Sequence, residues 1–194
     1  MKTALLLVDF QNDYFPGGKM ELHDIALVAD AAARLLAAFR SRFWPVLHVI
    51  HHSTRLGASF FLPGTTGAEI WSELAPLPGE PVIIKHFPNT FRKTDLLKQL
   101  QDARVGNVLA CGMISHICVD ATVRAAFDLG FACHIVHDAC GTTEFSFNGV
   151  TVPVNFAHAS YMASAGVYAR VVGSSEIIAA MATAEGADAL SFAR

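Results

Sequence analysis

The sequence predicts an α/β fold in three layers, with a six-stranded parallel sheet between helices in a Rossmann-like arrangement. Two observations carry this prediction. Short apolar runs alternate with amphipathic helical segments along the chain, as in proteins whose parallel strands are buried on both faces. The 194 residues, 53% hydrophobic and 16% charged, also suffice for one sizeable core. We therefore expect a single domain over residues 1–194.

Six apolar runs of strand length are expected to form the sheet. Each ends at a polar or glycine-containing loop. They occupy residues 2–8, 45–51, 81–84, 108–112, 131–137 and 167–172. Because a helical segment lies between most of them, the strands are expected to run parallel with right-handed crossovers.

Helical periodicity fills most of the connections. Residues 23–42 carry one apolar stripe, and a helix over 94–103 begins where Thr94 can cap it. Further helices are expected from about residue 117, over 152–165 and over 174–182. The connection 53–79 is rich in glycine and proline, and a loop of that length in a compact domain is often functional.

Composition argues against several classes of partner and location. With a formal charge of −3 and no run of like charges, the sequence gives no sign of a basic surface that would bind nucleic acid or an anionic membrane. No apolar stretch approaches the roughly 18 to 20 residues of a membrane span. The apolar run at 4–8 is too short for a signal peptide, so we expect a cytoplasmic protein. The four cysteines include no CxxC pair, which argues against a zinc knuckle or a disulfide framework.

Three chemically reactive side chains are expected at one edge of the sheet. Asp9 and Lys85 each follow an apolar strand, and Cys118 lies in the first turn of the helix after the fourth strand. Open α/β sheets bind ligands at this carboxyl edge. Each residue also has a plainer interpretation: Asp9 as a loop cap, Lys85 as an edge lysine, and Cys118 as a small buried hydrophobe.

Together the three groups could catalyse a thiol-dependent hydrolysis. Asp9 can take the thiol proton as general base and later protonate a leaving amine. Lys85 and the start of the helix favour anions, including a Cys118 thiolate and a developing oxyanion. If Lys85 lies two strands from Asp9, the backbones are about 10 Å apart, and only a long side chain closes that gap.

Three histidines on and after the second strand raise the question of a metal site. His48, His51 and His52 lie close together, but no nearby carboxylate spacing completes a ligand set. The chain also has no GxGxxG after its first strand and no GxxxxGK[ST] motif. We therefore expect neither a metal nor a nucleotide cofactor.

Three motifs, in this order, resemble the isochorismatase-like cysteine hydrolases. They are Leu-Val-Asp-Phe-Gln-Asn-Asp at 7–13, Ile-Lys-His-Phe-Pro-Asn-Thr-Phe at 84–91, and Gly-Met-Ile-Ser-His-Ile-Cys-Val-Asp-Ala-Thr-Val-Arg-Ala-Ala at 112–126. The resemblance implies that family's fold and its Asp-Lys-Cys triad at Asp9, Lys85 and Cys118. It also implies a cis peptide bond between Met113 and Ile114, which would aim the N–H groups of Ile114 and Cys118 as an oxyanion hole.

The resemblance also separates the possible reactions. Isochorismatases proper cleave a vinyl ether and lack the cysteine, so Cys118 favours a cysteine hydrolase that cleaves a C–N bond through a thioester. The substrate would be an amide, ureido or carbamoyl compound. Nicotinamidases share the triad but carry an Asp-x-His metal motif where this chain reads His-His-Ser-Thr-Arg at 51–55. A vinyl-ether hydrolase, a nicotinamidase and a non-catalytic binding protein are the alternatives.

Residues near the triad are candidates for contact with a small-molecule substrate. Phe15, Phe61 and Phe91 could form an apolar wall, because ligand pockets are mostly apolar with few polar anchors. Gln11 is expected either to order the loop after Asp9 or to meet the substrate. Members of the family commonly assemble, and the mean hydropathy of +0.39 suits a buried interface, so a homo-oligomer is expected.

Overall fold

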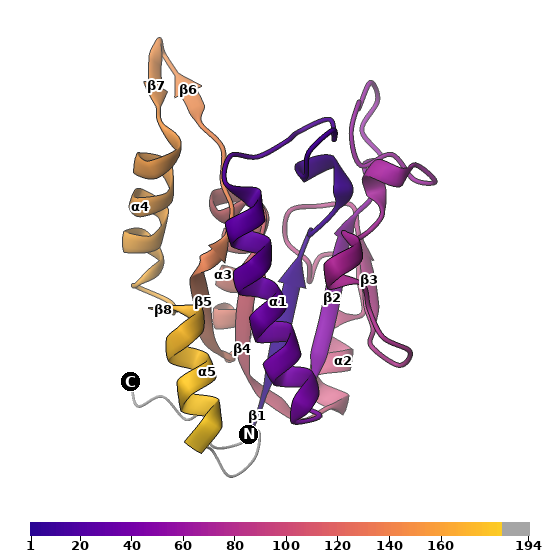
Figure 1. The fold of residues 1–194 in the computed structure, drawn as a ribbon, viewed down its shortest axis with the longest axis vertical. Helices are drawn as coiled ribbons and strands as arrows, with labels where there is room; N and C mark the ends of the chain where they lie inside the picture. The colour runs from indigo at the N-terminus through magenta and orange to yellow at the C-terminus, as the bar shows by residue number, and fades with distance from the viewer. Residues whose placement is uncertain (184–194) are drawn as a thin grey trace.

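Six parallel strands form the central sheet, in the order β3-β2-β1-β4-β5-β8 (Figure 1). The computed structural model describes residues 1–183. The strands are β1 (Lys2–Val8), β2 (Val46–His51), β3 (Val82–Lys85), β4 (Val105–Gly112), β5 (Ala132–Cys140) and β8 (Arg170–Val172). The predicted three-layer fold with a six-stranded parallel sheet is confirmed. The expectation of one domain extends to residues 184–194, which lie outside the described part.

Helices cover both faces of this sheet. They are α1 (Ile25–Ser41), α2 (Leu96–Asp102), α3 (Asp120–Asp128), α4 (Val154–Ala165) and α5 (Ser174–Thr183). Figure 1 shows α1 and α5 in front of the sheet and α2 and α3 behind it. The apolar stripe of α1 packs inward, with Leu35, Leu36 and Phe39 almost fully buried. The predicted amphipathic pattern therefore points at the sheet, as helix burial requires.

The region between β5 and α4 differs from the prediction. A short antiparallel hairpin, β6 (Phe145–Phe147) and β7 (Val150–Val152), precedes a helix that begins only at Val154. Asn148 and Gly149 form its turn, both with positive φ. An Asn-Gly pair between short strands is a strong hairpin signal. The helical prediction over 152–165 overlooked it.

The segment that carries Cys118 is also more elaborate than predicted. A π-helical turn, η4 (Ser115–Val119), separates β4 from α3, so the regular helix begins at Asp120. Such single wide turns are often found at functional sites. The Ser115 N–H donates to the carbonyl of Gly141 at 2.9 Å, which fixes η4 to the chain that follows β5.

Two short 3₁₀ turns organise the long connection after β2. They are η2 (Thr66–Ala68) and η3 (Ser72–Leu74). The connection is tied to the loop after β1, because the Asp13 carboxylate accepts hydrogen bonds from the N–H of Phe61 at 2.6 Å and of Lys19 at 3.2 Å. The buried Phe61 is thereby held against the carboxyl ends of the strands.

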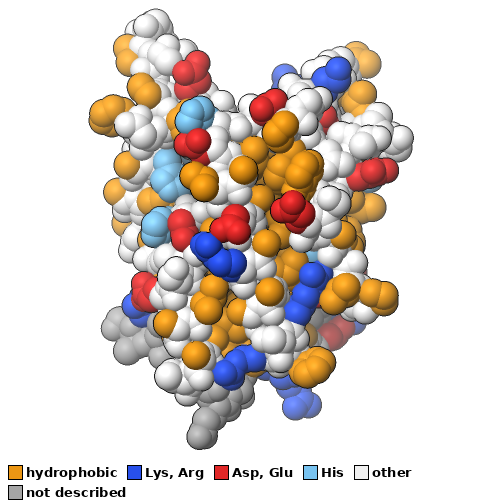
Figure 2. Space-filling model, viewed as in Figure 1, with side chains coloured by type: hydrophobic (Ala, Val, Ile, Leu, Met, Phe, Trp, Pro, Cys, Tyr) orange, Lys and Arg blue, Asp and Glu red, His pale blue; other side chains and the backbone are white. Residues whose placement is uncertain are grey.

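Two projections flank this edge of the sheet. The β6–β7 hairpin rises on one side, and the connection after β2 rises on the other (Figure 1). In the space-filling view, hydrophobic side chains gather in the notch between them (Figure 2). Within residues 1–183, no helix is long and apolar enough to cross a membrane.

Gly112 allows β1 and β4 to approach closely beside the site. Its φ is +135°, and a Cβ at this position would overlap the carbonyl oxygen of Val8. That oxygen accepts the N–H of Met113 at 3.0 Å. The end of β1, which leads directly into Asp9, is thus joined to the turn that leads to Cys118.

Gly112→Ala is expected to lower the free energy of unfolding by about 2–5 kcal/mol, because it adds overpacking to a left-handed backbone. The matched control is Gly149→Ala in the hairpin turn, where φ is +78° and no atom lies within 4 Å of the added Cβ. That variant is expected to lose only about 1–2 kcal/mol. Urea denaturation measures both, and equal losses would contradict the close approach of β1 and β4.

Candidate active site

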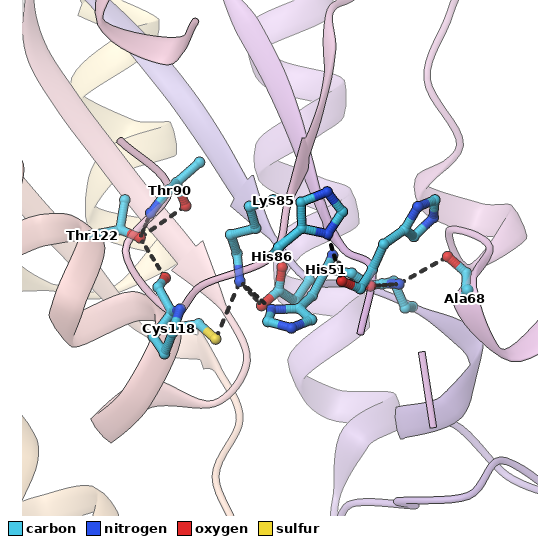
Figure 3. Close-up of polar contacts among 11 residues, drawn as sticks. His51, Ala68, Lys85, His86, Thr90, Cys118 and Thr122 are labelled. Atoms are coloured by element: carbon cyan, nitrogen blue, oxygen red, sulfur yellow. Dashed lines mark hydrogen bonds and ion pairs between the residues drawn. The ribbon is translucent and has the colours of Figure 1, made fainter. Parts of the chain in front are cut away.

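Asp9, Lys85 and Cys118 lie together at the carboxyl edge of the sheet. Figure 3 shows Lys85 and Cys118 with the hydrogen bond between them. Asp9 is the first residue after β1, Lys85 is the last residue of β3, and Cys118 lies in η4 after β4. Asp9 and Lys85 are fully buried, and Cys118 is 7% exposed. The structure therefore brings together the residues at which the sequence predicts the triad.

The Lys85 ammonium is the centre of this cluster. Its Nζ lies 2.8 Å from Asp9 Oδ2, 3.3 Å from Cys118 Sγ and 3.1 Å from His51 Nδ1. Strand β2 lies between β3 and β1, so Lys85 reaches Asp9 across two strand spacings. Only a side chain as long as lysine closes that gap, as the sequence predicts.

Two threonines fix the loop after Lys85 to the helix after Cys118. Thr122 Oγ1 accepts the N–H of Thr90 at 3.1 Å and shares a hydrogen bond with its hydroxyl at 2.9 Å. Both threonines are fully buried. Because this link is buried, it helps to fix the distance between the lysine and the thiol.

Electrostatics keep the lysine charged and the thiol protonated in the resting state. Burial would lower the pKa of Lys85, but the Asp9 carboxylate and Cys118 raise it above its ordinary value. Burial, reinforced by Asp9, raises the pKa of Cys118 to about 12, and Lys85 opposes this only in part. Lys85 favours the thiolate, as expected, but loss of solvation and the neighbouring carboxylate oppose it.

Asp9 has one oxygen free to receive the thiol proton. Its Oδ2 accepts from Lys85, whereas its Oδ1 is buried without a hydrogen-bond partner in the described part of the chain. A carboxylate oxygen of Asp9 lies within 4.8 Å of Cys118 Sγ. A buried acceptor without a partner is costly. Here it leaves a carboxylate oxygen available as a proton acceptor near the thiol.

A cavity of about 470 Å³ opens above the thiol. Its walls are mostly apolar, with a few polar side chains. The residues that line it are Tyr14, Met20, His51, Ser53, Thr54, Arg55, Phe60, Phe61, His86, Phe87, Pro88, Ile114, Ile117 and Cys118. The size and composition are those of a pocket for a small molecule.

Only one of the aromatic residues predicted for this wall lines the cavity. Phe61 does so, but Phe15 is buried beneath the site and stacks on Trp71 with ring centroids 4.1 Å apart. Phe91 packs toward Phe131 at 6.3 Å. The two are not part of the cavity lining because each completes an aromatic pair of the core. The sequence pattern did not single out the wall residues Tyr14 and Phe87.

Gln11 holds the site together and does not line the cavity. Its Nε2 donates to the carbonyls of His51 at 3.0 Å and Ala68 at 2.8 Å, and its Oε1 accepts the His51 N–H at 2.7 Å. The side chain is fully buried. Of the two roles expected for Gln11, the structure supports the ordering of loops.

The peptide bond between Met113 and Ile114 is cis, as the family resemblance implies. Ile114 and Cys118 both line the cavity, on the side where β4 ends. That the N–H groups of these two residues form an oxyanion hole stays a prediction, and their position in the cavity wall is compatible with it.

The donor atoms of Asp9, His51 and Cys118 lie within 4.8 Å of one another, a spacing that a metal ion could use. Lys85 Nζ is hydrogen-bonded to each of these residues, however, so a cation already occupies the centre of the set. A second cation there would meet strong repulsion. The residues do not fit a metal ion at this position. Among the other histidines, His48 bonds to Glu80 at 2.9 Å and has a structural role.

A buried thiol, carboxylate and ammonium beneath an apolar cavity, on a doubly covered parallel sheet, define a cysteine hydrolase of α/β architecture. The family model described as the isochorismatase domain matches residues 3–150. The chain therefore belongs to the isochorismatase family of hydrolases.

Individual proteins agree with this assignment. The chain is 48% identical over 172 residues to the isochorismatase family protein YddQ of Bacillus subtilis, covering 88% of this chain and 96% of that protein. A crystal structure described as an isochorismatase hydrolase from Oleispira antarctica has a TM-score of 0.88 and 47% identity, with 92% and 96% of the chains covered. Streptothricin hydrolase of Streptomyces noursei is 33% identical over 141 residues, which are 73% of this chain and half of that enzyme.

Asp9→Asn is expected to make the Cys118 thiol more acidic. The substitution removes the carboxylate that raises the pKa of the thiol and leaves Lys85, which lowers it. The rate of Cys118 alkylation by iodoacetamide, followed by mass spectrometry, should therefore rise at a lower pH in the variant than in the wild type. Cys118→Ala is the control for labelling of the other three cysteines. If the midpoint of the pH dependence of Cys118 alkylation stayed the same or moved to higher pH in Asp9→Asn, the Asp9 carboxylate would not be raising the pKa of the thiol.

Proposed function

We propose that this protein hydrolyses a C–N bond of a small amide, ureido or carbamoyl substrate through a thioester on Cys118. The observation that carries the proposal is the Lys85 ammonium, which bonds to both Asp9 and Cys118 beneath an apolar cavity. A thiol so placed is an accessible nucleophile with a base beside it. The name of streptothricin hydrolase, which denotes a hydrolase of a small molecule, is consistent with this class of reaction.

Acylation would begin as Cys118 Sγ attacks the substrate carbonyl and its proton moves to Asp9. The negative charge then resides on the carbonyl oxygen, which the N–H groups of Ile114 and Cys118 are proposed to stabilise. As the tetrahedral intermediate collapses, the C–N bond breaks and Asp9 returns the proton to the leaving nitrogen. A thioester remains on the enzyme. The raised pKa of the thiol suits this order, because the proton leaves sulfur only as the S–C bond forms.

Deacylation would use the same groups on water. Asp9 takes a proton from a water molecule, whose oxygen attacks the thioester carbonyl. The C–S bond breaks, and Asp9 returns the proton to the sulfur as the acid product leaves. Lys85 stays charged throughout and remains hydrogen-bonded to Asp9 and Cys118, whose anionic forms it favours.

The first experiment measures ammonia release from a panel of primary amides, ureido acids and nicotinamide. We expect Cys118→Ala to lose at least about 10³-fold in turnover, since a nucleophile is removed, and Asp9→Asn to lose about 10²–10⁴-fold as the general base is lost. Cys133→Ala, at a buried thiol on β5, is the matched control and should keep its rate. A chelator should leave the rate unchanged. Full turnover by Cys118→Ala on any compound of the panel would overturn the thioester mechanism.

We also propose that the chain forms a homo-oligomer in the cytoplasm. Apolar side chains of the hairpin and α4 are exposed, among them Phe147 at 82% and Phe156 at 65%. A lone two-stranded hairpin is marginally stable in water, and contact with a second copy would stabilise it. The four cysteines are free thiols, which suits a reducing compartment.

Sedimentation velocity at two protein concentrations tests the assembly. The wild type should sediment as an oligomer at both, and Phe147→Ser combined with Phe156→Ser should shift it to a monomer by removing the exposed apolar area. Phe43→Ser changes a phenylalanine that is 96% exposed just after α1, a helix that ends far from the hairpin (Figure 1), and should leave the assembly intact. A wild-type monomer at both concentrations would contradict the proposal.

A further inference from the structure

The Lys85 ammonium has three N–H bonds and three partners, and the proposed triad accounts for two of them. The third partner is His51 Nδ1, at 3.1 Å (Figure 3). An ammonium can only donate hydrogen bonds, so Nδ1 must be the acceptor and cannot carry a proton. A neutral imidazole without a proton on Nδ1 carries it on Nε2. Lys85 therefore selects the tautomer of His51.

The ring remains neutral under ordinary conditions. Burial, reinforced by the charge of Lys85, lowers the pKa of His51 to about 4. Near neutral pH the ring thus has one acceptor, which Lys85 occupies, and one donor, the Nε2–H.

That donor belongs to a residue of the cavity wall. His51 is half-buried and lines the cavity together with Cys118 and Phe61. Nε2 has no hydrogen-bond partner among residues 1–183. The backbone of His51 is held at both its N–H and its carbonyl by the buried Gln11. The donor is therefore preorganised by contacts on three of the four polar atoms of this residue.

We infer that His51 determines substrate specificity by donating a hydrogen bond from Nε2 to an oxygen or nitrogen acceptor beside the reacting carbonyl. This inference rests on the proposed function. Most of the surrounding wall is apolar, including Phe60, Phe61 and Phe87. An apolar substituent in this position would leave the donor without a partner, and a site built to hydrogen-bond a substrate discriminates strongly against analogues that lack the partner atom.

Two substitutions separate the two roles of the ring. His51→Asn places its amide near the position of Nδ1, so it can still accept from Lys85 but does not reach as far as Nε2. His51→Gln places its amide nitrogen near the position of Nε2, so it keeps a donor toward the cavity and no longer supplies the Nδ1 acceptor. His52→Asn is the control, because His52 is the adjacent histidine and does not line the cavity.

The experiment compares two primary amides of equal length, one with a carboxamide as the acceptor and one with an isopropyl group in its place. Their affinities are measured by calorimetry on Cys118→Ala protein, which binds without turnover. We expect the acceptor-bearing amide to bind about 10-fold more tightly or better. Adding His51→Asn should bring the ratio near one, whereas adding His51→Gln or His52→Asn should preserve it.

A second readout isolates the contact with Lys85. With Cys118 restored, the pH dependence of its alkylation should be unchanged in His51→Asn and His52→Asn and altered in His51→Gln. Equal affinities in the Cys118→Ala protein, binding of neither amide, or a preference that survives His51→Asn would each overturn the inference. A failure of the proposed function would look different. The acceptor-bearing amide would still bind more tightly, but no Cys118-dependent release of ammonia would be observed.

Discussion

The buried ammonium of Lys85 is the constraint on which the rest of the site depends. A charged group without solvent exposure is stable only with a close opposite charge and satisfied hydrogen bonds, and Asp9 supplies the charge at 2.8 Å. The strand order makes that pairing possible. Because β2 separates β3 from β1, the lysine must cross the end of β2, and there it meets His51. One side chain thus connects the ends of three neighbouring strands and, through Cys118, the turn after a fourth.

This arrangement also explains why a thiol with a raised pKa is compatible with nucleophilic chemistry. The resting site contains one positive charge, one negative charge and a neutral thiol. In the proposed acylation, the negative charge moves toward the substrate oxygen as the proton moves from sulfur to Asp9, and the number of charges around Lys85 does not change. A preformed thiolate beside Asp9 would place two anions next to one ammonium. The structure disfavours that state until the carboxylate is neutralised.

The features that the sequence predicted correctly depend on local patterns and on a general property of parallel sheets. Apolar runs identify the six strands, and the carboxyl ends of parallel strands meet at one edge, so Asp9, Lys85 and Cys118 were predictable. The pocket wall was less predictable. Whether a phenylalanine faces the cavity depends on contacts distant in sequence, such as Phe15 with Trp71. The role of His51 was not predictable for the same reason, because it depends on a contact with Lys85, which is distant in sequence.

Chemistry and specificity come from different parts of this fold. The proposed reacting groups lie at strand ends and in η4, where the core determines their separation, whereas most of the cavity wall comes from the loops after β1, β2 and β3. Asp13 nevertheless joins the loop after β1 to the loop after β2 at the Phe61 N–H, and Gln11 anchors the loop after β1 to the end of β2 at both polar backbone atoms of His51. A change of loop sequence can therefore alter the wall without moving the ammonium. His51 is the exception, since one ring contacts both Lys85 and the cavity. A substitution there alters selectivity and the environment of the thiol together, unless it preserves the acceptor at Nδ1.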